Sequence, residues 1–115
     1  MALNADVAGL LGAVSNVYYP NMPADIDNAV CIYATGGYER SASGTEVEEP
    51  TFQIKVRNTV YATGIALCDT IKDILHGYVG GKFLAIYQQG DVIDIGRDTN
   101  NRQEWTINFR CYYRR

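Results

Sequence analysis

The clearest hydrophobic pattern in the chain lies between Pro50 and Arg57, where apolar and polar side chains alternate. A strand with one buried face has this period of two. The apolar side chains are Phe52, Ile54 and Val56, and the polar ones are Gln53, Lys55 and Arg57. The stretch therefore predicts a strand in a sheet that has one dry side and one wet side.

From Val60 the apolar residues recur at spacings of three and four, which is the period of a helix with one buried stripe. They are Val60, Gly64, Leu67, Ile71, Ile74, Leu75 and Tyr78. Asn58 or Thr59 is the expected N-cap, and Gly77 can adopt the left-handed conformation that ends a helix. We expect this helix to lie on the dry side of the sheet.

Four other segments complete the predicted fold. Leu3 to Val14 has apolar residues at helical spacing, although two glycines weaken it, and Asn16 to Met22 is expected to be an extended crossing into the sheet. Asn28 to Thr35 is a continuous β-prone run, typical of a strand covered on both faces. The last two strands begin at Lys82, with a bend at Gly90, and at Gln103, after a turn at Asp98 to Asn101.

The element order is therefore helix, strand, strand, helix, strand, strand. It predicts an α+β fold in which two helices pack on one face of a four-stranded, mostly antiparallel sheet. With 115 residues, the chain is expected to form one domain, residues 1–115, around one core. The other face of the sheet is expected to be largely polar.

Residues 38–50 contain several acidic side chains and no regular apolar period. We expect them to form an exposed acidic loop. Loops of this length in a small domain are often functional, so the segment is either a plain hairpin connection or an arm that binds a partner.

Composition limits the classes of function. A net charge of −3 argues against binding nucleic acid with the whole surface, which requires a clustered positive field. No apolar run approaches the ~20 residues that cross a bilayer, and the N-terminus lacks the basic region of a signal peptide, so an intracellular chain is expected. Cys31, Cys68 and Cys111 have no metal-binding or disulfide spacing and are expected to be small buried residues.

Few residues suggest catalysis, and neither a metal site nor a cofactor is expected. His76 is the only histidine and is expected to lie at the C-terminal end of a helix, where it interacts favourably with the helix dipole. Asp91, Asp94 and Asp98 form a carboxylate cluster in sequence, but in an extended segment they would point to different faces. The chain also has nine tyrosines, too many for so small a core, and tyrosine is favoured at protein interfaces.

Several ordered words of the sequence resemble a known family. They are NVYY, NMP, DNAVCIYATGGY, EPTFQIKVRNTVYATG, LCDTIKDILHG, QQGDVIDIGRD and NRQEWTINFRCYYR, from about Asn16 to the C-terminus. Together they resemble the small phage minor capsid proteins, which are similar to the tail terminators of long-tailed phages. That family's fold, two helices against a four-stranded sheet, agrees with the order predicted above.

The resemblance implies a structural role without catalysis. Copies of the chain would assemble in the host bacterial cytoplasm into a ring, usually a hexamer, that caps the tail tube, ends its growth and joins the tail to the head connector. The implied partners are other copies, the tail tube protein and the head–tail connector or stopper. Passing DNA would make at most passive contact, and no membrane is involved. The virion tail and neck would be its location.

The interface of such a ring is expected to use strand edges, tyrosines and the acidic loop. The candidate interface residues are Tyr38, Glu39, Arg40, Glu46, Glu48, Glu49, Tyr112 and Tyr113. Lys55, Arg57 and Arg110 are candidate basic residues facing the channel, or ordinary solvated residues of the sheet.

Two alternatives remain at the level of sequence. A head-side connector or another minor capsid protein would share the fold and the composition. A small ligand-binding or enzymatic α+β domain would instead use Asp91, Asp94 or His76 in a pocket. A ring-forming assembly protein predicts self-association, whereas a ligand-binding or enzymatic domain predicts a discrete titratable site.

Overall fold

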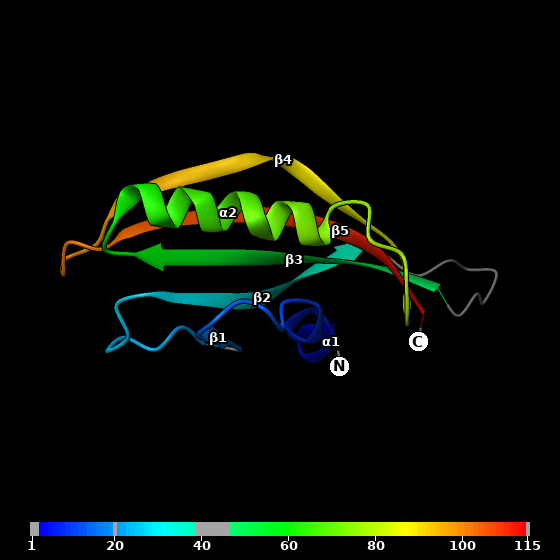
Figure 1. The fold of residues 1–115 in the computed structure, drawn as a ribbon. Coiled ribbons are helices and arrows are strands. Elements are labelled where there is room, and N and C mark those ends of the chain that lie inside the picture. Colours follow the sequence, from blue (N-terminus) through cyan, green and yellow to red (C-terminus); the bar gives the residue numbers. More distant parts are fainter. Residues whose placement is uncertain (1–2, 20, 39–46, 115) are drawn as a thin grey trace.

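The computed structural model describes residues 3–19, 21–38 and 47–114. They form two helices and five strands (Figure 1). In chain order these are α1 (Leu3–Leu10), β1 (Val17–Tyr18), β2 (Ala29–Tyr38), β3 (Val47–Asn58), α2 (Tyr61–Leu75), β4 (Phe83–Arg97) and β5 (Gln103–Arg114).

The strands form a single sheet in the order β1-β2-β3-β5-β4. The α+β class is confirmed, and all pairs are antiparallel except β1 with β2. The prediction of four strands was wrong because Val17 and Tyr18 pair with Val30 and Cys31 as a fifth, parallel strand. Two residues carry no readable period, so the sequence indicated only an extended crossing there.

The two predicted elements at the centre of the chain form, with two corrections at their junction. Val60, predicted on the buried stripe of the helix, is 54% exposed and precedes the helix. Phe52, Ile54 and Val56 are fully buried on one side of β3. The N-cap of α2 is Val60, and the Asn58 side chain instead accepts a hydrogen bond from the Val60 N–H at 2.9 Å. Asn58 therefore stabilises the turn before the helix. Gly77 has a φ of +79°, just after the end of the helix.

One hydrophobic core joins both helices to the same face of the sheet. Leu3 and Val7 of α1 and Ile71 of α2 belong to one buried cluster with alternate residues of β2, β3 and β5. The rings of Phe52 and Phe109 stack with their centroids 5.2 Å apart. The placement of both helices on one face is thus confirmed.

Gly64 sets how closely α2 approaches the sheet. A Cβ at this position would lie 2.2 Å from the six-membered ring of Trp105, which is fully buried beneath the helix. Only glycine permits that separation, so Gly64 is needed for packing although it lowers helix propensity.

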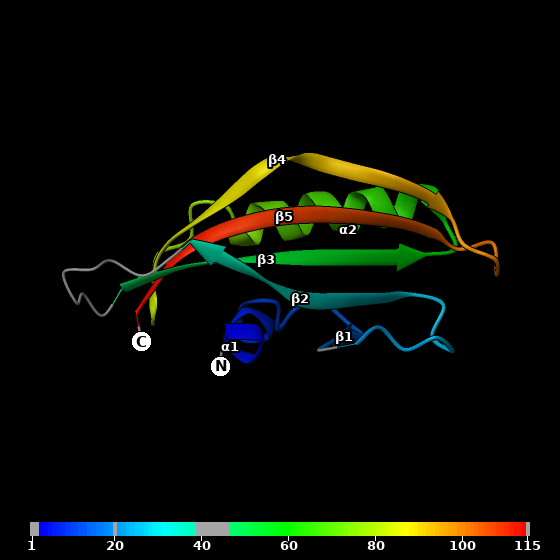
Figure 2. The ribbon, with the colours of Figure 1, turned by 180° about the vertical axis from the view of Figure 1, so that it is seen from behind.

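The molecule is elongated, with dimensions of 49 × 23 × 22 Å. In Figure 1, α2 lies in front of β3 and β5, and α1 lies against β2. The reverse view in Figure 2 shows the opposite face of the sheet, which neither helix covers. Within the described part of the chain, this open face and the outer edge of β4 are two of the surfaces that a partner can reach.

The ends of the predicted 38–50 loop belong to strands. Tyr38 pairs with Glu49, and Gly37 pairs with the buried Pro50. A register shift between Ala34 and Gly37 interrupts the pairing of β2 with β3, which resumes at Gly37 and Tyr38, beyond the predicted strand end at Thr35. Residues 39–46 lie outside the described ranges.

The long edge strand β4 is irregular. Its register against β5 shifts between Gln89 and Ile93 and again between Asp94 and Gly96, and Gly90 and Gly96 have positive φ values. The predicted bend at Gly90 is confirmed. These bulges twist the edge and change which side chains lie on each face.

Candidate assembly interface

The open face of the sheet carries a ladder of polar pairs. Cross-strand contacts join Thr35 to Thr51 at 2.8 Å, Gln53 to Asn108 at 3.1 Å and Lys55 to Glu104 at 3.3 Å. The Lys55 ammonium is thus paired with a carboxylate on the neighbouring strand. The open face is therefore largely polar, as predicted, and the charge of Lys55 is balanced by that of Glu104.

Arg57 does not face a channel. Its side chain is buried, with 4% of its surface exposed, and donates hydrogen bonds to the backbone carbonyls of Pro23 and Ile26. The prediction placed it correctly on the polar side of β3, but the segment before β2 covers that side. Arg57 therefore stabilises the chain's own backbone, and the prediction of a channel-facing residue was wrong.

Arg102 has the same role and was not singled out in the sequence. Its guanidinium donates to the Ala24 carbonyl at 2.8 Å and to the Asp98 carboxylate at 2.8 Å. Only 5% of the residue is exposed. Arg57 and Arg102 together fasten residues 23–26 to the ends of β3 and β5.

Arg110 lies in an aromatic cluster on the open face. Its guanidinium carbon is 6.0 Å from the ring centroid of Tyr87 and 5.8 Å from that of Tyr112, and the two rings meet edge to face. Tyr87 is 41% exposed. Two of the predicted residues, Arg110 and Tyr112, are therefore brought together, with Tyr87 as a third member that the prediction missed.

Tyr113 lies in the core and not on the surface. It is 4% exposed, and its hydroxyl donates a hydrogen bond to the Asp6 carboxylate of α1. Burial, together with that bond, raises the pKa of the Tyr113 hydroxyl. The prediction of Tyr113 as a contact residue was wrong, because β5 alternates and Tyr113 lies on its core side.

The remaining predicted contact residues come from the acidic segment. Glu48 and Glu49 are half-buried in β3, opposite Tyr113 and Tyr38. Glu39, Arg40 and Glu46 lie outside the described residues, as does the side chain of Tyr38.

An acidic groove of about 340 Å³ runs between α2 and β4. Its walls carry the carboxylates of Asp69, Asp91 and Asp94 around the Lys72 ammonium, which lies 3.4 Å from Asp69 and 3.6 Å from Asp91. Tyr61 donates to Asp94 at 3.3 Å. Three carboxylates and one ammonium leave the groove negatively charged.

The predicted separation of the aspartates is only partly right. Asp91 and Asp94 line the same groove, because Asp91 falls within the bulge after Gly90. Asp98 lies in the turn before β5, where the Arg102 backbone N–H is the main group that lowers the pKa of its carboxyl. Asp98 is therefore structural.

His76 and the cysteines do not join the groove. His76 is the C-cap of α2, so its predicted place at a helix end is confirmed, and its Nδ1 accepts a hydrogen bond from the Gln88 N–H at 3.0 Å. All three cysteines are free and buried, as expected. Burial raises the pKa of Cys68 and of Cys111 to about 12.

Exposed apolar side chains accompany the charged residues at two places. Val60 and Tyr61 at the start of α2 are 54% and 48% exposed, and Tyr61 lines the acidic groove. On β4, Ile93 and Ile95 are each 51% exposed, and Ile93 pairs with Thr106 of β5. At the other place, Val79 and Leu84 flank the exposed Lys82 and are 69% and 38% exposed.

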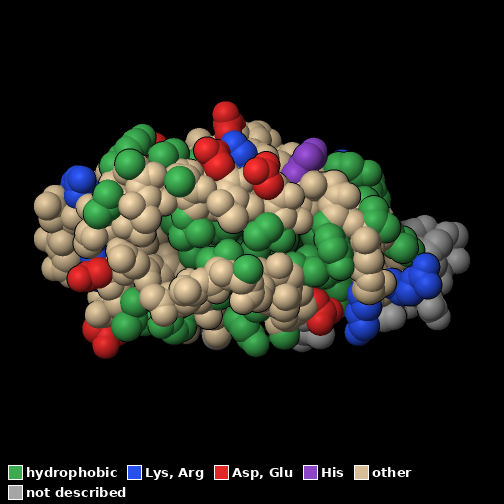
Figure 3. Space-filling model, viewed as in Figure 1, with side chains coloured by type: hydrophobic (Ala, Val, Ile, Leu, Met, Phe, Trp, Pro, Cys, Tyr) green, Lys and Arg blue, Asp and Glu red, His purple; other side chains and the backbone are tan. Residues whose placement is uncertain are grey.

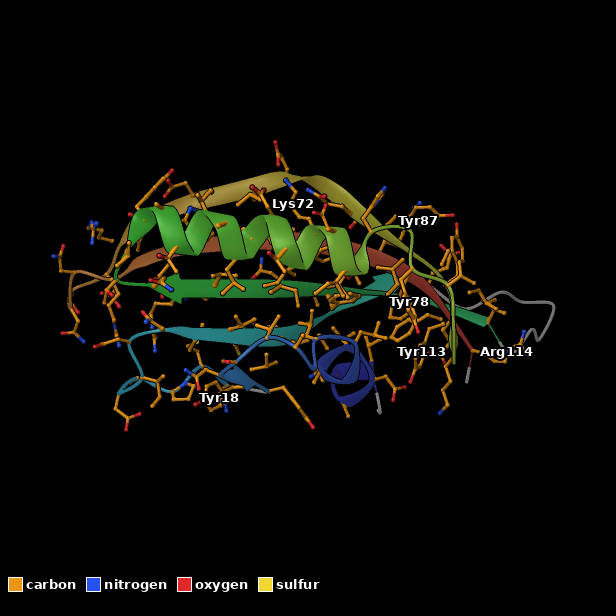
Figure 4. All side chains as sticks on the ribbon, in the orientation of Figure 1. Tyr18, Lys72, Tyr78, Tyr87, Tyr113 and Arg114 are labelled. Carbon is orange, nitrogen blue, oxygen red and sulfur yellow. The ribbon has the colours of Figure 1, made fainter. Side chains whose placement is uncertain are left out.

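Lys82 belongs to a basic end of the molecule. The Arg114 N–H donates to the Lys82 carbonyl at 2.8 Å, and the Lys82 ammonium lies 6.0 Å from the Tyr113 ring centroid. Arg114 is exposed at the same end. Figure 4 places Lys72 over α2 and Arg114 at the far end of the molecule, and Figure 3 shows the corresponding acidic and basic patches apart.

Within the ranges that the structure describes, no group of His, Cys, Asp and Glu residues is arranged to hold a metal ion. The helices of this part of the chain are also too short or too polar to span a membrane.

The sequence model of the family described as bacteriophage tail terminator protein matches residues 4–115. The chain belongs to this family. Its role is accordingly that of a structural tail terminator protein of a phage, and the resemblance found in the sequence is confirmed. A comparison with curated proteins found no match.

A chain of a solved structure, the virion of a native gene transfer agent particle, has a similar fold. The two superpose with a TM-score of 0.60 at 16% sequence identity, over 100% of this chain and 89% of the other. At this identity the likeness concerns the fold of the terminator.

Proposed function

We propose that this terminator forms a ring, most simply a hexamer, that caps the tail tube, ends its polymerisation and joins the tail to the head. The observation that carries the proposal is the family match, which extends over nearly the whole chain, residues 4–115. The proposal places the protein in the tail and neck of the virion after assembly in the host cytoplasm. The protein acts by contact and without catalysis.

The surface of the molecule supports this role. Large apolar side chains remain exposed on the edge strand β4 and beside Lys82, where a partner would bury them. The cluster of Tyr87, Arg110 and Tyr112 combines exposed aromatic area with a cation, a composition enriched at interfaces. We assign this cluster to contact with the tail tube or the head connector.

The mass of the purified protein in solution tests the ring. Light scattering over a dilution series, at low and moderate salt, should show a species approaching six times the chain mass of 12.8 kDa. If the ring forms only on the tail tube, each tube end should bind the number of copies that makes up one ring. A chain that stays monomeric and does not bind tube ends would contradict the proposal.

A further inference from the structure

We propose that the acidic groove between α2 and β4 of one copy receives the basic end, Lys82 and Arg114, of the next copy. This inference rests on the proposed function, because it specifies the contact that builds the ring. The occupant is a second copy of the chain, and the reasons are charge, apolar composition and geometry.

The charges of the two surfaces are complementary. Asp69 and Asp91 have side chains that are 66% and 87% exposed, and they share Lys72 as a partner. The basic end presents Lys82 and Arg114, which the backbone hydrogen bond of Arg114 to Lys82 holds side by side. Opposite potentials of this kind steer encounter and fix the register of two proteins.

Each surface also offers apolar area beside its charges. Tyr61, Ile65 and Val92 line the groove, and Tyr61 is 48% exposed. Val79 and Leu84 flank Lys82 at the basic end. A guanidinium that enters the groove would meet the carboxylates of Asp69 and Asp91 and the ring of Tyr61. Arginine in such a setting is a common anchor of protein interfaces.

The geometry fits a ring. The groove lies along the length of α2, whereas the basic end lies at one end of the molecule (Figure 4). A contact between two different patches is heterologous, so each copy uses one patch for each neighbour. Such contacts generate a closed ring when the rotation between copies closes.

A charge exchange tests the contact. Asp91→Lys and Arg114→Glu should each weaken self-association roughly tenfold, because each places like charges together. The combined variant should recover association to within about threefold of the original protein, since the pair is restored with reversed sign. Sedimentation at several concentrations, or light scattering on tail tubes, measures the association. Asp25→Lys is the control, because it makes the same charge change at an exposed site before β2.

The outcomes separate this contact from the function itself. Single variants that assemble like the original protein, or a combined variant that fails to recover, would overturn the contact even if tubes are still capped. Loss of capping by Asp91→Lys with self-association intact would assign the groove to the tube protein and also overturn it. A protein that never self-associates, on tubes or in solution, overturns both the contact and the proposed ring.

Discussion

The basic side chains at the two ends of the sheet differ in what they contact. Arg57 and Arg102 are 4% and 5% exposed, and their guanidinium groups donate to backbone carbonyls of residues 23–26. Lys82 and Arg114 lie at the other end and are exposed. The first pair is used within the fold, and the second pair remains available to a neighbour.

This difference separates stability from assembly. A buried guanidinium that satisfies carbonyls cannot be removed without leaving those acceptors unpaired, which costs free energy of folding. An exposed charge contributes little to stability because solvent screens it. Variants of the two pairs should therefore affect different measurements.

The largest effect is expected at the buried pair. Arg102→Met should lower the free energy of unfolding by about 3 kcal/mol, because the Asp98 carboxylate and the Ala24 carbonyl lose their partner. Urea unfolding measures the change. Arg114→Met is the matched control and should change stability by less than about 0.5 kcal/mol. Equal stability of the two variants would contradict a structural role for the buried pair.

A smaller effect is expected at Tyr113, which links β5 to α1. Tyr113→Phe should lower stability by about 1 kcal/mol, because it removes the hydrogen bond to Asp6. Tyr87→Phe, at an exposed ring, should have almost no effect. A Tyr113→Phe protein as stable as the original at neutral pH would show that the bond adds nothing to the fold.

The same tyrosine predicts an alkaline pH dependence. Its folded pKa is raised, so the folded state holds the proton more tightly than the unfolded state. Its contribution is thus fully present below the unfolded pKa of about 10 and is lost as the pH rises above it. Unfolding midpoints measured upward from pH 9 should fall more steeply for the original protein than for Tyr113→Phe. Parallel curves would contradict this.

Asp98 predicts the opposite behaviour in acid. The pKa of its carboxyl is lowered, mainly by the Arg102 backbone N–H and then by the Arg102 side chain and the Asn100 N–H. The stability it contributes is present above the unfolded pKa and is lost as the pH falls below about 4. Asp98→Asn should flatten the acid limb of the stability curve, whereas Asp25→Asn should leave it unchanged. An unchanged acid limb in Asp98→Asn would contradict the assigned role.

The smallest effects on stability are expected at the exposed charges. Lys82→Ala and Asp69→Asn should each change the free energy of unfolding by less than about 0.5 kcal/mol. Their effect should appear instead in self-association, and added salt should reduce the difference between variants. A loss of stability above 1 kcal/mol in either variant would place that residue with the buried pair.

The periodic parts of the sequence predicted most of the fold. Alternation predicted the buried side of β3, and the helical spacing after Val60 predicted the stripe of α2 that joins the core. These predictions succeed because each depends on one burial direction repeated over several residues. The strand β1 has two residues and offers no such repetition.

The site was harder to predict because it depends on distant or irregular contacts. Alternation placed Arg57 on the polar face, but its acceptors lie 31 and 34 residues away. Regular strand geometry separates Asp91 from Asp94, and only the bulge brings them into one groove. The i, i+4 spacing of Asp98 and Arg102 within a turn was the one local signal for the buried arginine.

Tube length tests most directly whether this chain ends the tail tube. Purified tail tube protein would be polymerised with and without the terminator, and tubes would be measured by electron microscopy. Substoichiometric terminator is expected to shorten the tubes and to add ring-shaped density at one end only. Tubes of unchanged length, with no protein bound at either end or with it bound along their sides, would contradict the claim.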